Sequence, residues 1–279
     1  MTRIRDWTTP HREKGDFVEY YTVKKIYPWL YGIYDPIDVY IYLVLGNDTA
    51  VIYDTAYGIA SIMPVIRKIT DLPITCVLGH GHIDHANGAY QFGEAWIHDE
   101  DFELCLRHTG KTARGMALDR AKEKGIKMPK DFDEDIYIKS GRPNLKKMDI
   151  GQVFDLGGRS LEVVKMEGHT HGSVGLLVKE DRVLLTSDGA NPYLWLFLEE
   201  STSISTYIAM LERNINLKFD TFFIGHDHRP FEKEFFKKFI RVAKNANVTQ
   251  SVPYERLPER KGLLYKEGDI SIIFSSDKL

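Results

Sequence analysis

A dense cluster of metal-binding side chains lies at residues 80–85 of this 279-residue chain. The segment reads HGHIDH, contains His80, His82, Asp84 and His85, and directly follows the apolar run ITCVLG. Imidazole and carboxylate groups are the ligands that Zn²⁺ takes in water-activating sites, whereas Ca²⁺ prefers oxygens. On a loop that leaves a strand, His80 and His82 point the same way and can bind one ion, while Asp84 and His85 turn toward a second position. A polar surface loop is the alternative.

Further polar residues stand at the ends of other apolar runs. His169 follows LEVVKMEG, His226 follows FDTFFIG, Asp188 ends VLLTSD and Asp54 ends AVIYD. Strand ends converge at one edge of a sheet, where ligand sites are commonly built. Packing alone does not explain why so many strands would each deliver a His or Asp to the same edge, so the sequence predicts a metal site rather than a polar loop.

The elements that must position these residues alternate between hairpins and helices. Hairpins are predicted where turn residues separate two apolar runs, at residues 39–56, 152–166, 173–188 and 262–276. Helices are predicted where apolar residues recur at helical spacing, at residues 57–70, 203–217 and 231–246. Pro64 fits the first of these only if that helix begins close before it. The pattern falls in two similar halves and predicts an α/β fold with helices outside two packed sheets.

The segment 100–147 differs in character from its surroundings. It begins helix-like but is interrupted by Gly110 and Gly115, and it continues as a charged, irregular stretch. A long charged segment inside a strand-rich domain is typical of an insertion. We therefore predict one domain over residues 1–279, with 100–147 as a helical and irregular cap.

The motifs together resemble the metallo-β-lactamase-fold superfamily. The resemblance runs from about residue 30 to residue 230 and includes the motifs VIYDT, HGHIDH, GHTHGS, LLTSDG and FIGH in that order. It implies a four-layer αββα sandwich with a dinuclear metal site at one edge.

The resemblance also implies a role for each matching residue. His80, His82 and His169 would bind one divalent ion, and Asp84, His85 and His226 the other, with Asp188 bridging both. Asp54 would hold the metal-binding loops from behind. The ions would be Zn²⁺, with Mn²⁺ or Fe²⁺ as alternatives.

The bridging position narrows the activity that the resemblance implies. Asp188, in place of Cys or Ser, resembles glyoxalase-II-like, lactonase-like and phosphodiesterase-like members, and His82 stands where redox di-iron members carry Glu. We therefore expect hydrolysis of an ester, thioester or lactone by a metal-bridging hydroxide, with Asp84 orienting the water. A mononuclear-iron dioxygenase or another oxidoreductase, a phosphodiesterase and a β-lactam hydrolase remain open.

Candidate substrate contacts are less defined by motif. The segment 191–200 places Tyr193 and Trp195 just after Asp188, where they could line an apolar pocket, form a homodimer surface or belong to the core. His228 lies two residues past His226 and could face the substrate or an exposed turn. In the cap, four residues could reach the substrate or form a solvated face: Arg107, His108, Arg114 and Tyr137.

Composition limits the partners. The net charge of −3 gives no basic excess for nucleic acid. No apolar run approaches the roughly 18 residues of a membrane span, and the N-terminus lacks the apolar stretch of a secretion signal. Cys76 and Cys105 fit no metal or redox spacing. We therefore expect a cytoplasmic protein acting on a small molecule, with no nucleic acid or membrane partner.

Overall fold

The computed structural model describes residues 16–18, 20–257 and 260–279. Residues 1–15, where no secretion signal was expected, lie outside the described residues. Where the chain is described, no helix is long and apolar enough to cross a bilayer.

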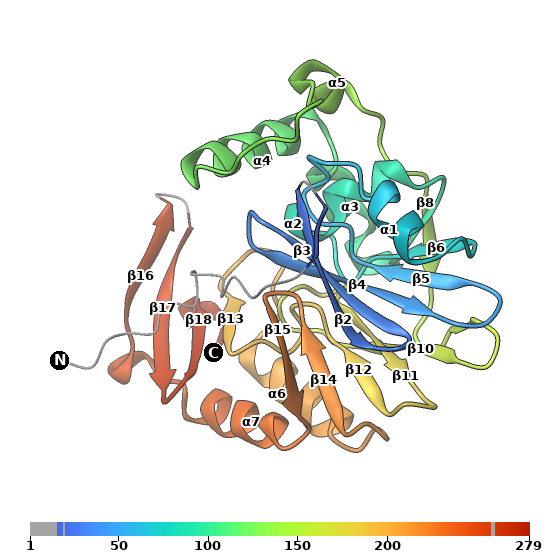
Figure 1. The fold of residues 1–279 in the computed structure, drawn as a ribbon. Helices are drawn as coiled ribbons and strands as arrows, with labels where there is room; N and C mark the ends of the chain where they lie inside the picture. Colours follow the sequence, from blue (N-terminus) through green and yellow to red (C-terminus); the bar gives the residue numbers. More distant parts are fainter. Residues whose placement is uncertain (1–15, 19, 258–259) are drawn as a thin grey trace.

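The strands form three sheets (Figure 1). The first has eight strands in sequential order: β1 (Asp16–Val18), β2 (Tyr21–Tyr27), β3 (Leu30–Asp35), β4 (Val39–Leu45), β5 (Ala50–Tyr53), β6 (Ile74–Val77), β7 (Ala95–His98) and β8 (Leu145–Met148). The second has six strands in the order β15 (Asp227–Glu232), β14 (Thr221–Ile224), β12 (Val183–Leu185), β11 (Val174–Val178), β10 (Ser160–Lys165) and β9 (Val153–Asp155). The third has four strands in the order β13 (Tyr193–Leu196), β18 (Ile270–Phe274), β17 (Arg260–Glu267) and β16 (Val252–Leu257).

The first two sheets pack face to face and helices cover their outer faces, which confirms the predicted αββα sandwich. Alternation along β5 shows how: Val51 and Tyr53 pack in the core between the sheets, whereas Ala50 and Ile52 pack on the helical side. The outer face of the second sheet is covered by α6 (Ile204–Asn214) and α7 (Phe235–Asn245). Of the third sheet, the sequence predicted only the antiparallel pair β17–β18, as the hairpin at residues 262–276. Strand β18 belongs to that same outer core.

Local sequence explains the helices beside the sheets. Helix α1 (Met63–Ile69) begins immediately before Pro64, because proline has no N–H to lose in the first turn. Helix α6 begins after Ser203, whose hydroxyl accepts a hydrogen bond from the backbone N–H of Thr206. Both starts agree with the sequence prediction.

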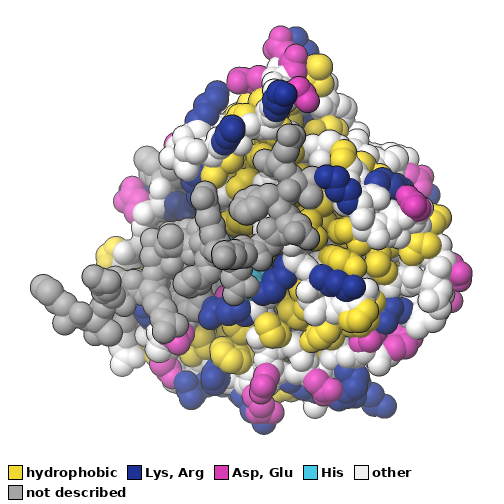
Figure 2. Space-filling model, in the orientation of Figure 1, with side chains coloured by type: hydrophobic (Ala, Val, Ile, Leu, Met, Phe, Trp, Pro, Cys, Tyr) yellow, Lys and Arg dark blue, Asp and Glu magenta, His cyan; other side chains and the backbone are white. Residues whose placement is uncertain are grey.

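The expected cap contains more regular structure than its sequence suggested. It forms α3 (Phe102–His108), α4 (Lys111–Glu123) and α5 (Glu134–Lys139), and α4 and α5 project from the sandwich (Figure 1). Gly110 separates α3 from α4, but Gly115 lies inside α4 and interrupts nothing, so the expected break there was wrong. The end of the segment is β8, which pairs in parallel with β7 in the first sheet. Lys and Arg side chains are exposed over α4 and α5 (Figure 2).

Candidate metal centre

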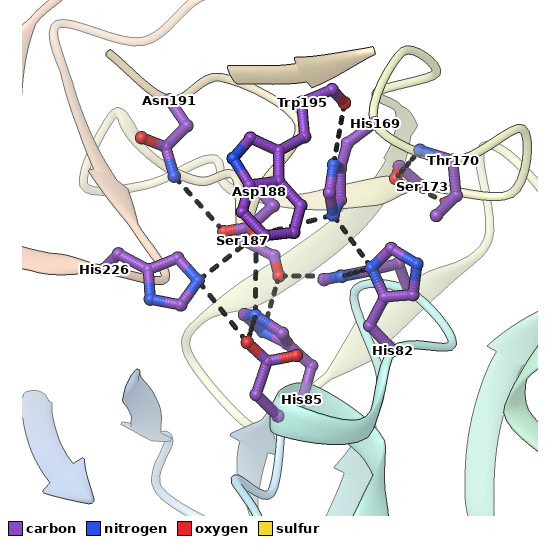
Figure 3. Close-up of polar contacts among 12 residues, drawn as sticks. His82, His85, His169, Thr170, Ser173, Ser187, Asp188, Asn191, Trp195 and His226 are labelled. Carbon is purple, nitrogen blue, oxygen red and sulfur yellow. Dashed lines mark hydrogen bonds and ion pairs between the residues drawn. The ribbon is translucent and has the colours of Figure 1, made fainter. Parts of the chain in front are cut away.

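The predicted ligands come from separate loops that meet at one edge of the sandwich. His80 and His82 lie in the turn after β6, and His82 is the N-cap of the short helix α2 (Ile83–Ala86). His169 follows β10, Asp188 follows β12, and His226 lies between β14 and β15. Figure 3 shows the side chains of His82, His85, His169 and His226 arranged around Asp188.

The first group consists of His80, His82 and His169. Nδ1 of His82 lies 2.8 Å from Nε2 of His169 and 3.1 Å from Nε2 of His80. On their outer sides, Nε2 of His82 donates to the Glu200 carboxylate at 2.6 Å and Nδ1 of His169 donates to the Trp195 carbonyl at 3.0 Å. Each outer nitrogen therefore carries the proton, and the inner nitrogens present lone pairs to one another.

The second group consists of Asp84, His85 and His226. Nδ1 of His226 donates to the carbonyl of Asp38 at 2.6 Å, and Nδ1 of His85 donates to the Asp54 carboxylate at 2.8 Å. The inner Nε2 atoms of both histidines lie 3.8 Å from Oδ2 of Asp84. Nε2 of His85 is buried and has no hydrogen-bond partner among the described residues.

Asp188 lies between the two groups. Its Oδ2 atom is 3.6 Å from Nε2 of His169, 3.2 Å from Nε2 of His226 and 3.7 Å from Nε2 of His85. The 3.2 Å contact with His226 is a hydrogen bond, whereas the contacts with His169 and His85 are longer. Cations placed among these groups would attract the carboxylate oxygens and the nitrogen lone pairs. The orphaned Nε2 of His85 and the imidazole–carboxylate donor set fit divalent metal ions.

Two carboxylates of the cluster are held ionised. Burial alone would raise the pKa of Asp84, but His85 and His226 override it and lower the pKa to about 2. Burial is likewise outweighed at Asp188, where His226 and His85 hold the pKa well below its usual value. Both carboxyl groups are thus ionised at neutral pH.

The histidines divide by position. Burial and the neighbouring His82 lower the pKa of His169 to about 4, and burial and His85 hold the pKa of His80 well below its usual value. At His226, Asp188 outweighs burial and raises the pKa to about 10. His80 and His169 therefore offer neutral imidazoles, the form that binds metal, whereas Asp188 favours the charged form of His226.

Asp54 lies behind the second group. Its carboxylate accepts hydrogen bonds from His85, from the Ser187 hydroxyl at 2.7 Å and from the Gly79 N–H at 2.7 Å. Asp54 and Ser187 both have a positive φ, of 65° and 49°, which costs energy for residues other than glycine. These contacts fix His85 and join its loop to the loop that carries Asp188.

Sequence reasoning missed Asp101, which joins two other ligand loops. Its buried carboxylate accepts from the N–H of Gly81 at 2.8 Å, the N–H of Gly172 at 2.8 Å and the hydroxyl of Thr170 at 2.7 Å. A Cβ on Gly81 would lie 2.7 Å from the backbone nitrogen of Cys105, so only glycine fits there. Glu200, behind His82, was also missed. Neither residue belongs to a motif, and no spacing indicates them.

The three candidate substrate residues lie in different surroundings. Tyr193 and Trp195 lie in β13 and are half-buried, and Trp195 packs on Phe197 at 5.3 Å between ring centroids. His228 is buried beside Tyr40, with 3.4 Å between its Nδ1 and the tyrosine hydroxyl, and not in an exposed turn. Trp195 contacts the predicted ligand His169 through its carbonyl. A homodimer surface at this segment stays a prediction.

Cap residues also approach the site. The ring of His108 lies 5.4 Å from that of His82, and Nδ1 of His108 lies 3.2 Å from the carbonyl of Gly81. Tyr137 and Arg114 are buried rather than solvated, and Tyr137 donates to the carbonyl of Tyr57 at 2.8 Å. The cap is therefore packed onto the sandwich and borders the ligand cluster at His108.

Comparison with known proteins identifies relatives of the central region. The sequence profile described as metallo-beta-lactamase superfamily matches residues 34–226. The acyl-coenzyme A thioesterase MBLAC2 of Bos taurus is 28% identical over 193 residues, covering 63% of this chain and 67% of the relative. The Homo sapiens protein of the same name is 27% identical over 193 residues, with the same coverage.

Solved structures show the same fold at low sequence identity. A metallo-beta-lactamase from Pontibacter korlensis has a TM-score of 0.56 and 15% identity, covering 81% of this chain and all of that one. The sec-alkylsulfatase Pisa1 from Pseudomonas sp. has a TM-score of 0.57 and 14% identity, covering 80% of this chain and 40% of that one.

Proposed function

Because this chain belongs to the metallo-β-lactamase superfamily and is a metal-dependent hydrolase, we propose that it binds two divalent metal ions and hydrolyses a small-molecule thioester. The observation that carries the proposal is the position of Asp188 Oδ2, within 3.2–3.7 Å of inner nitrogens from both histidine groups. A single carboxylate oxygen in contact with two sets of imidazoles is suited to bridge two ions.

The residues would divide between the ions as the resemblance implies. One ion would be held by His80, His82 and His169. The other ion would be held by Asp84, His85 and His226, and Asp188 would be shared by both. Neutral imidazoles and carboxylates favour Zn²⁺. When bound, two such ions lower the pKa of a water from about 15.7 toward 7 and polarise a substrate carbonyl.

Asp84 is the residue we assign to the water. Its side chain is 23% exposed, whereas that of Asp188 is 11% exposed, so Asp84 is the more open of the two carboxylates. With a pKa near 2 it is ionised at neutral pH and can accept a hydrogen bond or a proton from water. In thioester hydrolysis the acyl C–S bond breaks, a C–O bond forms from water, and the departing thiolate takes up a proton.

A thioester is favoured over an ester or a lactone because of the relatives. The proteins from Bos taurus and Homo sapiens are named as acyl-coenzyme A thioesterases, and their matches cover 63% of this chain. Residues 227–279 lie outside the matched profile, so substrate details that depend on β15–β18 do not transfer.

We propose the cytoplasm as the compartment. Cys76 and Cys105 are free and buried, which is typical of proteins in a reducing compartment.

The test combines metal analysis with a substrate panel. The purified protein, loaded with Zn²⁺ or Mn²⁺, is assayed against a thioester, an ester, a lactone, a β-lactam and a phosphodiester. We expect two ions per chain and the highest kcat/KM on the thioester. One redox-active iron per chain would instead indicate the dioxygenase alternative, and activity confined to a β-lactam or phosphodiester would overturn the thioester assignment.

A further inference from the structure

A basic cavity lies in the cap, away from the ligand cluster. It has a volume of about 410 Å³ and is formed where α3 ends, α4 begins and the segment after α5 passes over them. Four of its lining side chains are cationic and none is acidic: Arg107, Lys111, Arg114 and Arg142. A cavity of this size can admit a small polar group.

These four cations differ from others in the protein in how they are paired. Among the described residues, none of the four forms an ion pair with a carboxylate, whereas cations elsewhere do, as Arg159 with Asp181 and Arg213 with Glu167. In a chain whose net charge is −3, this is a local excess of positive charge. Like charges gathered around one cavity repel one another, and an anion would relieve the repulsion.

The backbone at the cavity also favours an anion. Gly110 is the N-cap of the 13-residue helix α4, and no side-chain oxygen caps its first turn, which has no acidic residue. The Nη2 atom of Arg142 lies 3.4 Å from where a Cβ on Gly110 would stand, so the guanidinium lies directly over this helix end. Free N–H groups and the helix dipole attract negative charge to such an end.

Arg114 supplies an independent buried observation. Its side chain is 1% exposed and lines the cavity, yet its Nε–H has no acceptor among the described residues. Its two Nη atoms donate to the carbonyls of Ser140 and Gly141. Arg114 therefore has a structural role in holding the segment after α5. Its guanidinium also packs 4.8 Å from the centroid of the Tyr90 ring, and its Nε–H remains without an acceptor among the described residues.

The cavity borders the candidate metal centre through α3. The ring of His108 contacts the ring of His82. Gly110, two residues further along the chain, lines the cavity. Two peptide steps span at most about 7.6 Å between Cα atoms. Arg107 also lines a second cavity of about 260 Å³ that includes Glu200, the partner of His82. The second cavity is otherwise acidic, with Glu100, Glu103 and Glu199 in its lining, so a phosphate would bind in the first cavity alone.

We propose that this basic cavity binds a phosphate group carried by the thiol leaving group of the substrate. This inference rests on the proposed thioester hydrolysis and names its substrate class: a thioester whose thiol portion bears a phosphate several bonds from the sulfur. Lys111 and Arg142, both exposed, contact the phosphate, Arg107 borders the path to the metal centre, and guanidinium groups bind phosphate in a bidentate manner.

The test compares two thioesters with the same acyl group. One is an acyl-coenzyme A, and the other is an acyl thioester of N-acetylcysteamine, which has no phosphate. Arg142→Gln and Lys111→Gln should each lower kcat/KM for acyl-coenzyme A by about tenfold, mainly through KM, and leave the phosphate-free thioester unchanged. Lys127→Gln is the matched control, because Lys127 is exposed in the same cap but does not line the cavity.

Direct binding separates failure of this inference from failure of the proposed function. Calorimetry with coenzyme A and with inorganic phosphate needs no turnover. Binding of coenzyme A that weakens in Arg142→Gln and at high salt supports the cavity even if no thioester is hydrolysed. Equal affinity in the wild-type and Arg142→Gln proteins, or an equal loss on both thioesters, would overturn the inference while leaving hydrolysis itself untouched.

Discussion

The edge of the sandwich that carries the predicted ligands differs from the cap in how its polar side chains are paired. At the edge, histidine nitrogens that point away from the cluster have an acceptor behind them, as His169 has the Trp195 carbonyl and His226 the Asp38 carbonyl. In the cap, Lys111 and Arg142 have no carboxylate partner among the described residues. The edge is preorganised by the protein's own groups, whereas the cap leaves charge available for a ligand.

This difference in pairing agrees with the proposal that the edge carries out the reaction and that the cap recognises the substrate. A reaction that needs two ions in fixed positions requires side chains with one orientation, and buried partners supply it. Recognition of a particular leaving group needs accessible charge, and exposed side chains supply it at little cost in stability. Substitutions at the edge should therefore act on turnover, folding and metal affinity, and substitutions in the cap on KM for one class of substrate.

The largest effect is expected from Asp84→Asn, which removes the carboxylate of the second group. Loss of a positioned general base or water-orienting group lowers kcat by about 10²–10⁴-fold. The measurement is kcat on a thioester, with metal content determined in parallel. Retention of wild-type turnover would refute the role of Asp84.

Asp101→Ala should produce the next largest effect, on folding. It deprives two backbone N–H groups and the Thr170 hydroxyl of their acceptor in a buried position. We expect the free energy of unfolding of the metal-free protein to fall by about 3 kcal/mol, measured by urea denaturation. Asp119→Ala, an exposed residue of α4, is the control and should change it by less than about 0.5 kcal/mol. Equal losses in both variants would show that Asp101 does not join the ligand loops.

Glu200→Gln tests how His82 is oriented. Because the Glu200 carboxylate accepts from Nε2 of His82 at 2.6 Å, its loss should weaken metal binding about 10- to 100-fold. Competition with a chromophoric chelator measures this affinity. The neighbouring Glu199 is exposed, so Glu199→Gln makes the same charge change without the contact; a similar loss there would mean that local charge, not orientation, decides affinity.

The Glu200 carboxylate should also make the free energy of unfolding of the metal-free protein depend on pH. Burial alone would raise the pKa of Glu200, but the hydrogen bond with His82 lowers it from 4.5 to about 2. Between these values the unfolded chain binds more protons than the folded one, so this contribution is complete above about pH 4.5 and is lost as the pH falls toward 2. Unfolding free energies at pH 5 and pH 3 should therefore differ less in Glu200→Gln than in wild type, and an identical difference would contradict this.

The smallest effect is expected for the cap. Arg142→Gln removes an exposed cation from a group of like charges, so the free energy of unfolding should change by less than about 0.5 kcal/mol. Urea denaturation beside Asp101→Ala makes the contrast direct. A loss of several kcal/mol in Arg142→Gln would mean that the cap cations are structural and would erase the difference between the regions.

Strand ends and hairpin turns are local signals, so the sequence predicted the strands and which His and Asp side chains meet at one edge, while the resemblance supplied the four-layer arrangement. The sequence did not indicate Asp101 or Glu200, whose contacts with Gly81 and His82 span 20 and 118 residues. In the third sheet it predicted the β17–β18 hairpin but not the place of β13, which pairs with β18 in parallel across distant segments. The break expected at Gly115 was wrong because helical packing on the sandwich outweighs the modest helix penalty of one glycine.

The central claim is that Asp188 bridges two ions, and counting metal ions per chain by native mass spectrometry tests it most directly. The wild-type protein reconstituted with Zn²⁺ should carry two ions, and Asp188→Ala should carry one or none while remaining folded by circular dichroism. A single ion in the wild-type protein, or two ions retained at unchanged affinity in Asp188→Ala, would contradict the account.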